Sequence, residues 1–124
     1  MVLGVLAAVL ATPVPVVAPA AFPWCSRNAA VPAYAYDVEA FVRSHNGSPP
    51  KGYVGGSRYR DRTLKLPPWD GPFREYDVHP NVPGQKRDDE RIVLGPARSA
   101  AWYTPDHYET FVLMHPWGCF PILS

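Results

Sequence analysis

The hydrophobic pattern of the chain changes its period near residue 47, and this change restricts the fold more than any other feature. Within residues 32–45, apolar side chains recur at the three- and four-residue spacing of one helix face, namely Tyr34, Ala35, Val38, Phe41 and Val42. Pro32 suits the first helical position, and Asn46 or Gly47 suits the end. The pattern predicts one amphipathic helix.

After this helix, short apolar runs alternate with turn-forming residues. In FREYDV, residues 73–78, Phe73, Glu75 and Asp77 share one strand face. The other predicted strands are SRYRDRTLKL, RIVLG, AAWY and YETFVLM, and TPDH joins the last two. One helix followed by several strands predicts an α+β fold in which the helix packs on an antiparallel sheet.

The chain has 124 residues, which suits one small domain. Residues 1–21 contain a short apolar run and the small residues APA, as in a secretory signal, although a charged start is missing. The alternative is an apolar leader that lies outside the fold. The sequence therefore predicts a leader over residues 1–21 and one domain over residues 22–124.

Cys25 and Cys119 lie near opposite ends of the predicted domain. An even number of cysteines in an exported protein favours a disulfide, whereas two free thiols would suit a cytosolic protein. Neither cysteine stands in a recognisable nucleophile context.

Four side chains together supply the groups that phosphoryl transfer needs. Glu75 is a candidate general base, His107 a candidate general acid, and Arg87 with Arg91 a candidate phosphate clamp. Each also has an ordinary interpretation: a solvated strand face, an exposed turn histidine or a salt-bridged turn. The histidines lack a metal-ligand spacing, so the sequence predicts neither a metal site nor a cofactor.

The stretch SRYRDR alternates arginines with other side chains and includes Tyr59. It is either a charged edge strand or a nucleic-acid contact, in which cations bind phosphates and a ring stacks on a base. The net charge is only +1, so any basic site is local.

Several motifs, from about residue 31 to 114, carry a family resemblance: GYVGG, YRDRTLKLP, REYDV, PGQKRDDERIVLG and WYTPDHYETF. In order and spacing they resemble the small secreted bacterial guanyl-specific ribonucleases, the family of barnase and the streptomycete ribonucleases.

The resemblance implies Glu75 as general base, His107 as general acid and Arg87 with Arg91 as the phosphate clamp. It places Tyr108 beside the base and phosphate site. It also implies a base-recognition loop made of Tyr59, Arg60, Asp61, Arg62 and Thr63. Cys25 and Cys119 match the single disulfide of the streptomycete members.

The recognition loop departs from the family pattern at two positions. The family reads aromatic-x-Asn-Arg-Glu ahead of a Leu-Pro pair, which here is Leu66-Pro67. Asp61 replaces the asparagine, and Thr63 replaces the glutamate that accepts hydrogen bonds from guanine. We therefore expect a relaxed guanosine bias.

The sequence thus predicts a secreted, monomeric endoribonuclease that needs no metal and cleaves RNA through a 2′,3′-cyclic phosphate. The resemblance also makes a barstar-like protein inhibitor a plausible partner. One alternative is a non-catalytic RNA- or protein-binding module on the same scaffold. Another is a glycoside hydrolase that uses Glu75 and Asp77, but it leaves the arginines and His107 without a role.

Overall fold

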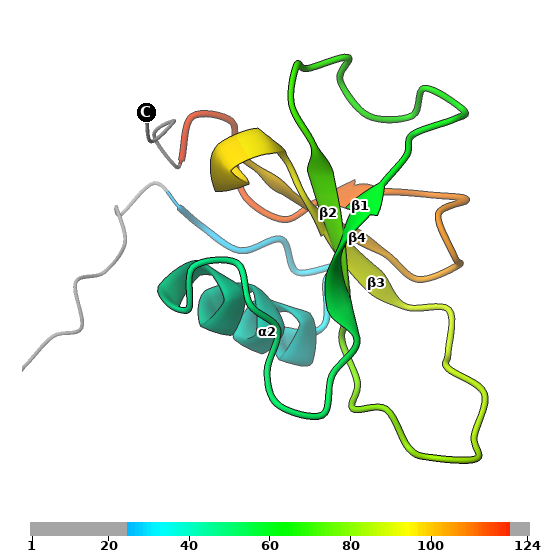
Figure 1. Ribbon diagram of the computed structural model, residues 1–124. Coiled ribbons are helices and arrows are strands. Elements are labelled where there is room, and N and C mark those ends of the chain that lie inside the picture. Colours follow the sequence, from blue (N-terminus) through cyan, green and yellow to red (C-terminus); the bar gives the residue numbers. More distant parts are fainter. Residues whose placement is uncertain (1–24, 120–124) are drawn as a thin grey trace, which may run out of the picture.

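The structure, a computed structural model, describes residues 25–119 and confirms the predicted α+β fold. In this part of the chain, five antiparallel strands follow one another in sequence order in a single sheet, and an α-helix lies against it (Figure 1). The elements are α2 (Ala33–Ser44), β1 (Gly55–Tyr59), β2 (Phe73–Asp77), β3 (Arg91–Leu94), the short 3-10 helix η1 (Pro96–Arg98), β4 (Ala101–Thr104) and β5 (Val112–Leu113).

Helix α2 ends where the sequence predicts. Asn46 and Gly47 both take positive φ angles, 54° and 88°, and the Gly47 amide donates to the Val42 carbonyl at 2.9 Å. At the other end, Pro32 flanks the helix in an extended conformation, one position before the predicted one. Because its φ is already fixed near the helical value, Pro32 still limits where the helix begins.

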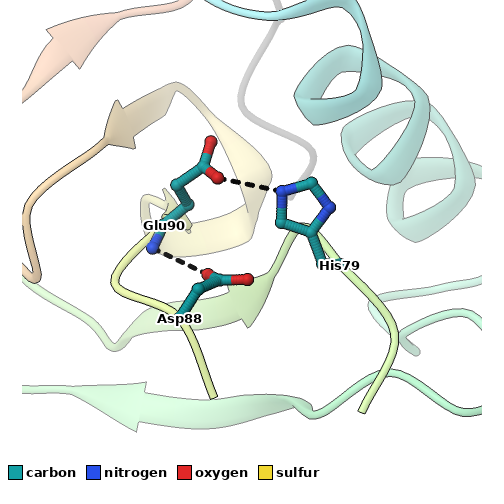
Figure 2. Close-up of side chains that lie close together, drawn as sticks. All are labelled: His79, Asp88 and Glu90. Atoms are coloured by element: carbon teal, nitrogen blue, oxygen red, sulfur yellow. Dashed lines mark hydrogen bonds and ion pairs between the residues drawn. The ribbon is translucent and has the colours of Figure 1, made fainter. Parts of the chain in front are cut away.

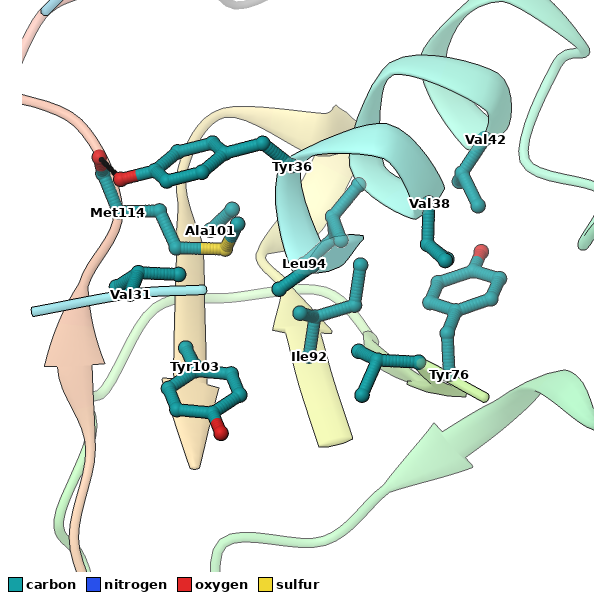
Figure 3. Close-up of a cluster of buried hydrophobic side chains, with 12 residues drawn as sticks. Val31, Tyr36, Val38, Val42, Tyr76, Ile92, Leu94, Ala101, Tyr103 and Met114 are labelled. Carbon is teal, nitrogen blue, oxygen red and sulfur yellow. Dashed lines mark hydrogen bonds between the residues drawn. The ribbon is translucent and has the colours of Figure 1, made fainter. Parts of the chain in front are cut away.

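The helix covers one face of the sheet and forms the main hydrophobic core with it (Figure 3). Tyr36 fills this core and donates its hydroxyl hydrogen to the Met114 carbonyl at 2.6 Å. The sequence pattern placed Tyr34 on the inward face of the helix. This part of the prediction is wrong, because Tyr34 is 39 % exposed. The core consists of Val31, Ala35, Tyr36, Val38, Val42, Tyr76, Val78, Ile92, Leu94, Ala101, Tyr103 and Met114.

The opposite face of the sheet, here called the open face, carries a second and smaller cluster. Its buried members are Leu66, Phe73, Val93, Ala100 and Trp102. The three long connections between the strands project away from the helix (Figure 1). The open face therefore has the exposed loops around it, and it is where the candidate catalytic side chains lie.

The first predicted strand is too long. Its stretch SRYRDRTLKL continues past β1, which ends at Tyr59, and residues 60–72 form a loop. Gly56, in the motif GYVGG, has a φ of 94° at a register shift of β1 against β2.

Cys25 and Cys119 form a disulfide with their Cα atoms 5.2 Å apart, as predicted. The bond joins the two ends of the described domain. Between residues 25 and 119, no helix is long and apolar enough to cross a membrane. The predicted leader, residues 1–21, lies outside the described residues.

Candidate active site

Strand alternation brings the first two acidic side chains to the open face. Glu75 and Asp77 stand two residues apart on β2, so both point away from the helix. In the sheet register Glu75 is opposite Val93 and Asp77 is opposite Arg91. Glu75, the candidate base, therefore lies on the strand next to Arg91, a candidate phosphate ligand, and two register positions away from it.

The half-buried carboxylate of Glu75 accepts two hydrogen bonds. Tyr108 donates its hydroxyl hydrogen to Oε2 at 2.9 Å, and Ser57 donates to Oε1 at 3.4 Å. Burial, the charge of Glu75 and this hydrogen bond raise the pKa of Tyr108 well above its usual value. Tyr108 thus stays protonated and remains a donor across the neutral range.

Asp77 holds the two candidate clamp arginines together. Arg87 donates two parallel hydrogen bonds to it, Nε to Oδ2 at 2.8 Å and an Nη to Oδ1 at 2.6 Å. These bonds raise the pKa of Arg87. Arg91 Nε lies 3.0 Å from the same Oδ1, an ion pair without hydrogen-bond geometry. Asp77 and Arg91 are both buried, whereas Arg87 is exposed.

Backbone carbonyls complete the fixation of Arg91. One of its Nη atoms donates to the carbonyl oxygens of Asp88 at 2.6 Å and Glu90 at 2.7 Å. Held on both sides, the guanidinium is fixed before any ligand arrives, and a fixed donor loses little entropy on binding an anion. The arrangement suits a negatively charged oxygen next to Glu75.

His107 stands on the turn between β4 and β5 in an unusual backbone conformation. Both His107 and Tyr108 have positive φ angles, 53° and 73°. Each left-handed non-glycine residue costs about 1–3 kcal/mol, and such residues gather at functional sites. The His107 amide donates to the Asp89 carbonyl at 2.8 Å, which ties this turn to the connection that carries Arg87.

Thr104 and Asp106 hold the strained turn in place. The Thr104 hydroxyl oxygen accepts the Tyr108 amide hydrogen at 2.9 Å. The Asp106 carboxylate accepts the amide of Thr110 at 2.8 Å and its hydroxyl at 2.7 Å, and these bonds lower the pKa of Asp106. His107, which is exposed, then lines a hollow of about 410 Å³ with Lys86, Arg87, Asp88, Asp89 and Arg91.

Glu90, directly before Arg91 in the chain, has hydrogen-bonding contacts with three side chains. Tyr34 and Tyr103 both donate to Oε1 at 2.5 Å. His79 Nε2 lies 2.9 Å from Oε2 (Figure 2). Burial raises the pKa of Glu90, but the hydrogen bonds outweigh burial and hold the pKa below its usual value. The network fixes the residue that precedes Arg91.

His79, Asp88 and Glu90 are also the described residues with the spacing of a cation site, since their ligand atoms lie within 4.8 Å of one another. Asp88 Oδ1 accepts the Glu90 amide at 2.9 Å. Both carboxylate oxygens of Glu90 have hydrogen-bonding partners. These contacts hold Glu90 in place, and its backbone carbonyl in turn accepts a hydrogen bond from Arg91.

The predicted recognition loop lies beside Glu75 and Tyr108. Tyr59 stacks on Tyr108 with ring centroids 4.7 Å apart, and burial together with the charges of Asp61 and Glu75 raises the pKa of Tyr59 to about 12. Asp61 points into its own loop, where its two oxygens accept the amides of Lys65 at 3.0 Å and Leu66 at 2.8 Å. Arg60, Arg62 and Thr63 are exposed.

The structure therefore groups the predicted residues into two neighbouring sets. Glu75, Tyr59 and Tyr108 form one, and Arg87, Arg91 and His107 line the hollow that forms the other. Sequence reasoning missed the anchoring role of Asp77 and the turn-holding roles of Thr104 and Asp106. The alternation of FREYDV signalled that Asp77 shares the face of Glu75, but not that two arginines converge on it.

Comparison with known proteins gives a consistent result. A family model described as ribonuclease matches residues 18–115, and the comparison with curated proteins gave no match. Among 46 matching chains of solved structures is the crystal structure of ribonuclease Sa2 with guanosine-2′-cyclophosphate. It is 29 % identical, with a TM-score of 0.51, and the alignment covers 69 % of this chain and 88 % of that chain.

Proposed function

The chain belongs to the microbial guanyl-specific ribonuclease family, and from this premise we propose that it is an endoribonuclease that cleaves single-stranded RNA through a 2′,3′-cyclic phosphate. One observation carries the proposal: Glu75 stands next to Asp77 on the open face, and Asp77 holds both arginines. A base thereby adjoins two cations, as transfer of a phosphoryl group requires.

In the first step, Glu75 removes the proton of the ribose 2′-hydroxyl. The 2′-oxygen attacks the phosphorus, and a pentacoordinate phosphorane forms. Arg87 and Arg91 stabilise the additional negative charge on its non-bridging oxygens. His107 donates a proton to the departing 5′-oxygen, so that the P–O5′ bond breaks and the 2′,3′-cyclic phosphate remains.

In the second step, the same two groups exchange roles. His107, now neutral, removes a proton from water, and the resulting hydroxide attacks the cyclic phosphate. Glu75 returns its proton to the 2′-oxygen as the P–O2′ bond breaks, and a 3′-phosphate is the product. The cycle uses side chains of this chain alone, and we propose that it needs no metal ion.

The base preference is proposed to be for guanosine, but relaxed. Thr63 stands where relatives carry a carboxylate, and a neutral hydroxyl accepts hydrogen bonds from the guanine edge more weakly. Asp61 cannot fully replace that carboxylate, because both of its oxygens accept loop amides. Loop amides and the stacked Tyr59–Tyr108 pair are the groups proposed to retain the bias.

We further propose that the protein is secreted and monomeric in its mature form, with RNA as its substrate and a barstar-like inhibitor as a candidate protein partner. The Cys25–Cys119 disulfide supports an oxidising location.

The test is incubation of purified protein with single-stranded RNA in excess EDTA, followed by mapping of the product ends. Cyclic phosphate and then 3′-phosphate ends, enriched after guanosine, are expected. Cleavage abolished by EDTA would exclude the metal-independent chemistry. Tight RNA binding without cleavage would favour the alternative that the altered loop raises, a binding module on a ribonuclease scaffold.

A further inference from the structure

Three tryptophans form a cluster on the open face that the proposed chemistry does not use. The ring centroids of Trp69, Trp102 and Trp117 lie 5.7 to 5.9 Å apart. Trp102 is buried in the smaller hydrophobic cluster, but Trp69 is 38 % and Trp117 59 % exposed. Contiguous exposed apolar surface of this kind marks a binding site more often than an isolated exposed side chain does.

The cluster continues the open face beyond Glu75. The ring of Trp69 packs over Gly95, where an added Cβ would come within 3.2 Å of the ring, and it also neighbours Phe73. Phe73 precedes Glu75 by two positions on the same face of β2 and precedes Asp77 by four. At the usual strand rise, Phe73 and Asp77 are about 13 Å apart, with Glu75 between them.

Cations accompany the exposed ring. Trp69 lines a hollow of about 420 Å³ together with Arg58, Arg60 and Arg62. Within residues 25–119 none of these three guanidinium groups forms an ion pair, whereas Arg87 and Arg91 share Asp77. Exposed rings beside uncompensated cations are the combination with which proteins bind single-stranded nucleic acid.

The position of the cluster fixes which nucleotide reaches it. In the proposed reaction the scissile phosphate is on the 3′ side of the recognised nucleoside and binds at Arg87 and Arg91. Trp69 neighbours Phe73, at the other end of the line of side chains Phe73, Glu75 and Asp77, and Trp117 contacts Trp69. We propose that these two side chains form a stacking subsite for the base of the nucleotide on the 5′ side, with Arg58 near its phosphate. This inference rests on the proposed function.

The test compares GpN with the 5′-extended substrate NpGpN, using kcat/KM for cleavage after guanosine. Trp117→Ala and Trp69→Leu should each reduce the gain from extension by about fivefold or more, because stacking on one aromatic ring contributes that much to binding a base. Trp69→Phe keeps an aromatic ring and should restore most of the gain. Phe41→Ala, which removes a ring on helix α2 across the sheet, is the matched control.

A second measurement does not depend on turnover. Deoxyribonucleotide analogues of the two substrates lack the 2′-hydroxyl and cannot be cleaved. Tryptophan fluorescence should be quenched by the extended analogue at lower concentration than by the short one, and Trp117→Ala should remove this difference.

The possible outcomes separate the two proposals. Cleavage after guanosine with the same gain from extension in all variants would overturn the subsite and leave the ribonuclease proposal intact. No cleavage of any RNA would overturn the ribonuclease proposal, and the quenching measurement alone would then decide the subsite. Equal quenching by both analogues would overturn the subsite. A gain that depends on Trp117 but comes from 3′ extension, rather than from 5′ extension, would also overturn the subsite.

Discussion

The hydroxyl of Tyr108 donates its hydrogen to the carboxylate of Glu75 at 2.9 Å, and so joins the β4–β5 turn to the middle of β2. His107 directly precedes Tyr108, so this hydrogen bond connects the segment that carries the candidate acid to the candidate base. The strained backbone of the turn and the packed strand thus hold the two groups in one fixed relationship.

Replacing either group should remove most of the activity. Glu75→Gln and His107→Gln each lose a positioned proton carrier, which typically costs about 10²–10⁴-fold in rate. Initial rates on RNA and the far-UV circular dichroism of each variant are the measurements. The wild-type pH–rate profile should be bell-shaped. Undiminished turnover in either folded variant would refute the role given to that residue.

Asp77→Asn should damage both the fold and the clamp. The substitution leaves the buried Arg91 with only the exposed Asp88 carboxylate, 3.5 Å away, as an ion-pair partner, and breaking a buried ion pair costs about 3–5 kcal/mol. Urea unfolding should show this loss, and KM for RNA should rise as Arg87 loses its orientation. The exposed Asp37→Asn is the matched control. Equal effects of the two substitutions would contradict the anchoring role.

Thr63→Glu should sharpen the preference for guanosine. A carboxylate accepts two charge-assisted hydrogen bonds from the guanine edge, and one good bidentate contact contributes about 1–3 kcal/mol of discrimination. The ratio of kcat/KM for GpN over ApN is the measurement, also in combination with Asp61→Asn. A ratio that Thr63→Glu does not change would show that another part of the loop reads the base.

Reduction of the Cys25–Cys119 disulfide should lower the thermal midpoint substantially. The bond closes a loop with a sequence separation of 94, which in the chain-entropy treatment stabilises the fold by about 4–5 kcal/mol. Calorimetry of oxidised and reduced protein, with alkylation to count thiols, measures this. Two thiols alkylated in the native, unreduced protein would exclude the bond.

The contribution of Glu90 to stability should depend on pH. Its pKa is below the usual carboxyl value in the folded state, so its stabilisation is present above about pH 4.5 and is lost as the pH falls through the lowered pKa. Glu90→Gln should therefore cost about 1–3 kcal/mol at pH 7 and clearly less at pH 3. Urea unfolding at both values tests this, and a cost independent of pH would contradict the ionised network.

Much of the fold was predictable, because a helix and a strand bury their side chains with different periods. The strand alternation of FREYDV correctly placed Tyr76 and Glu75 on opposite faces. The helix face was less accurate. Tyr34 donates to Glu90, which directly precedes β3, while Tyr36 fills the core, and both positions are aromatic in the sequence. Only the shape of the sheet decides between them.

The candidate site was predictable as a set of residue types rather than as a geometry. Arg87 and Arg91 were identified by their guanidinium groups, but their meeting at Asp77 depends on the β2–β3 register. The inward orientation of Asp61 depends on the path of its loop, where Leu64 has a φ of 55°. Such loop conformations follow from tertiary contacts that no local sequence pattern reveals.

The 5.2 Å between the Cα atoms of Cys25 and Cys119 means that the described domain begins and ends at one place. A short peptide linker could therefore close this gap and produce a circularly permuted enzyme with new termini elsewhere. The exposed segment around Val82 and Gly84 is suited to the new ends. It precedes Arg87 in the chain, and a chain break there would interrupt no strand. For the same reason, the domain could be inserted into a surface loop of a host protein as a compact module.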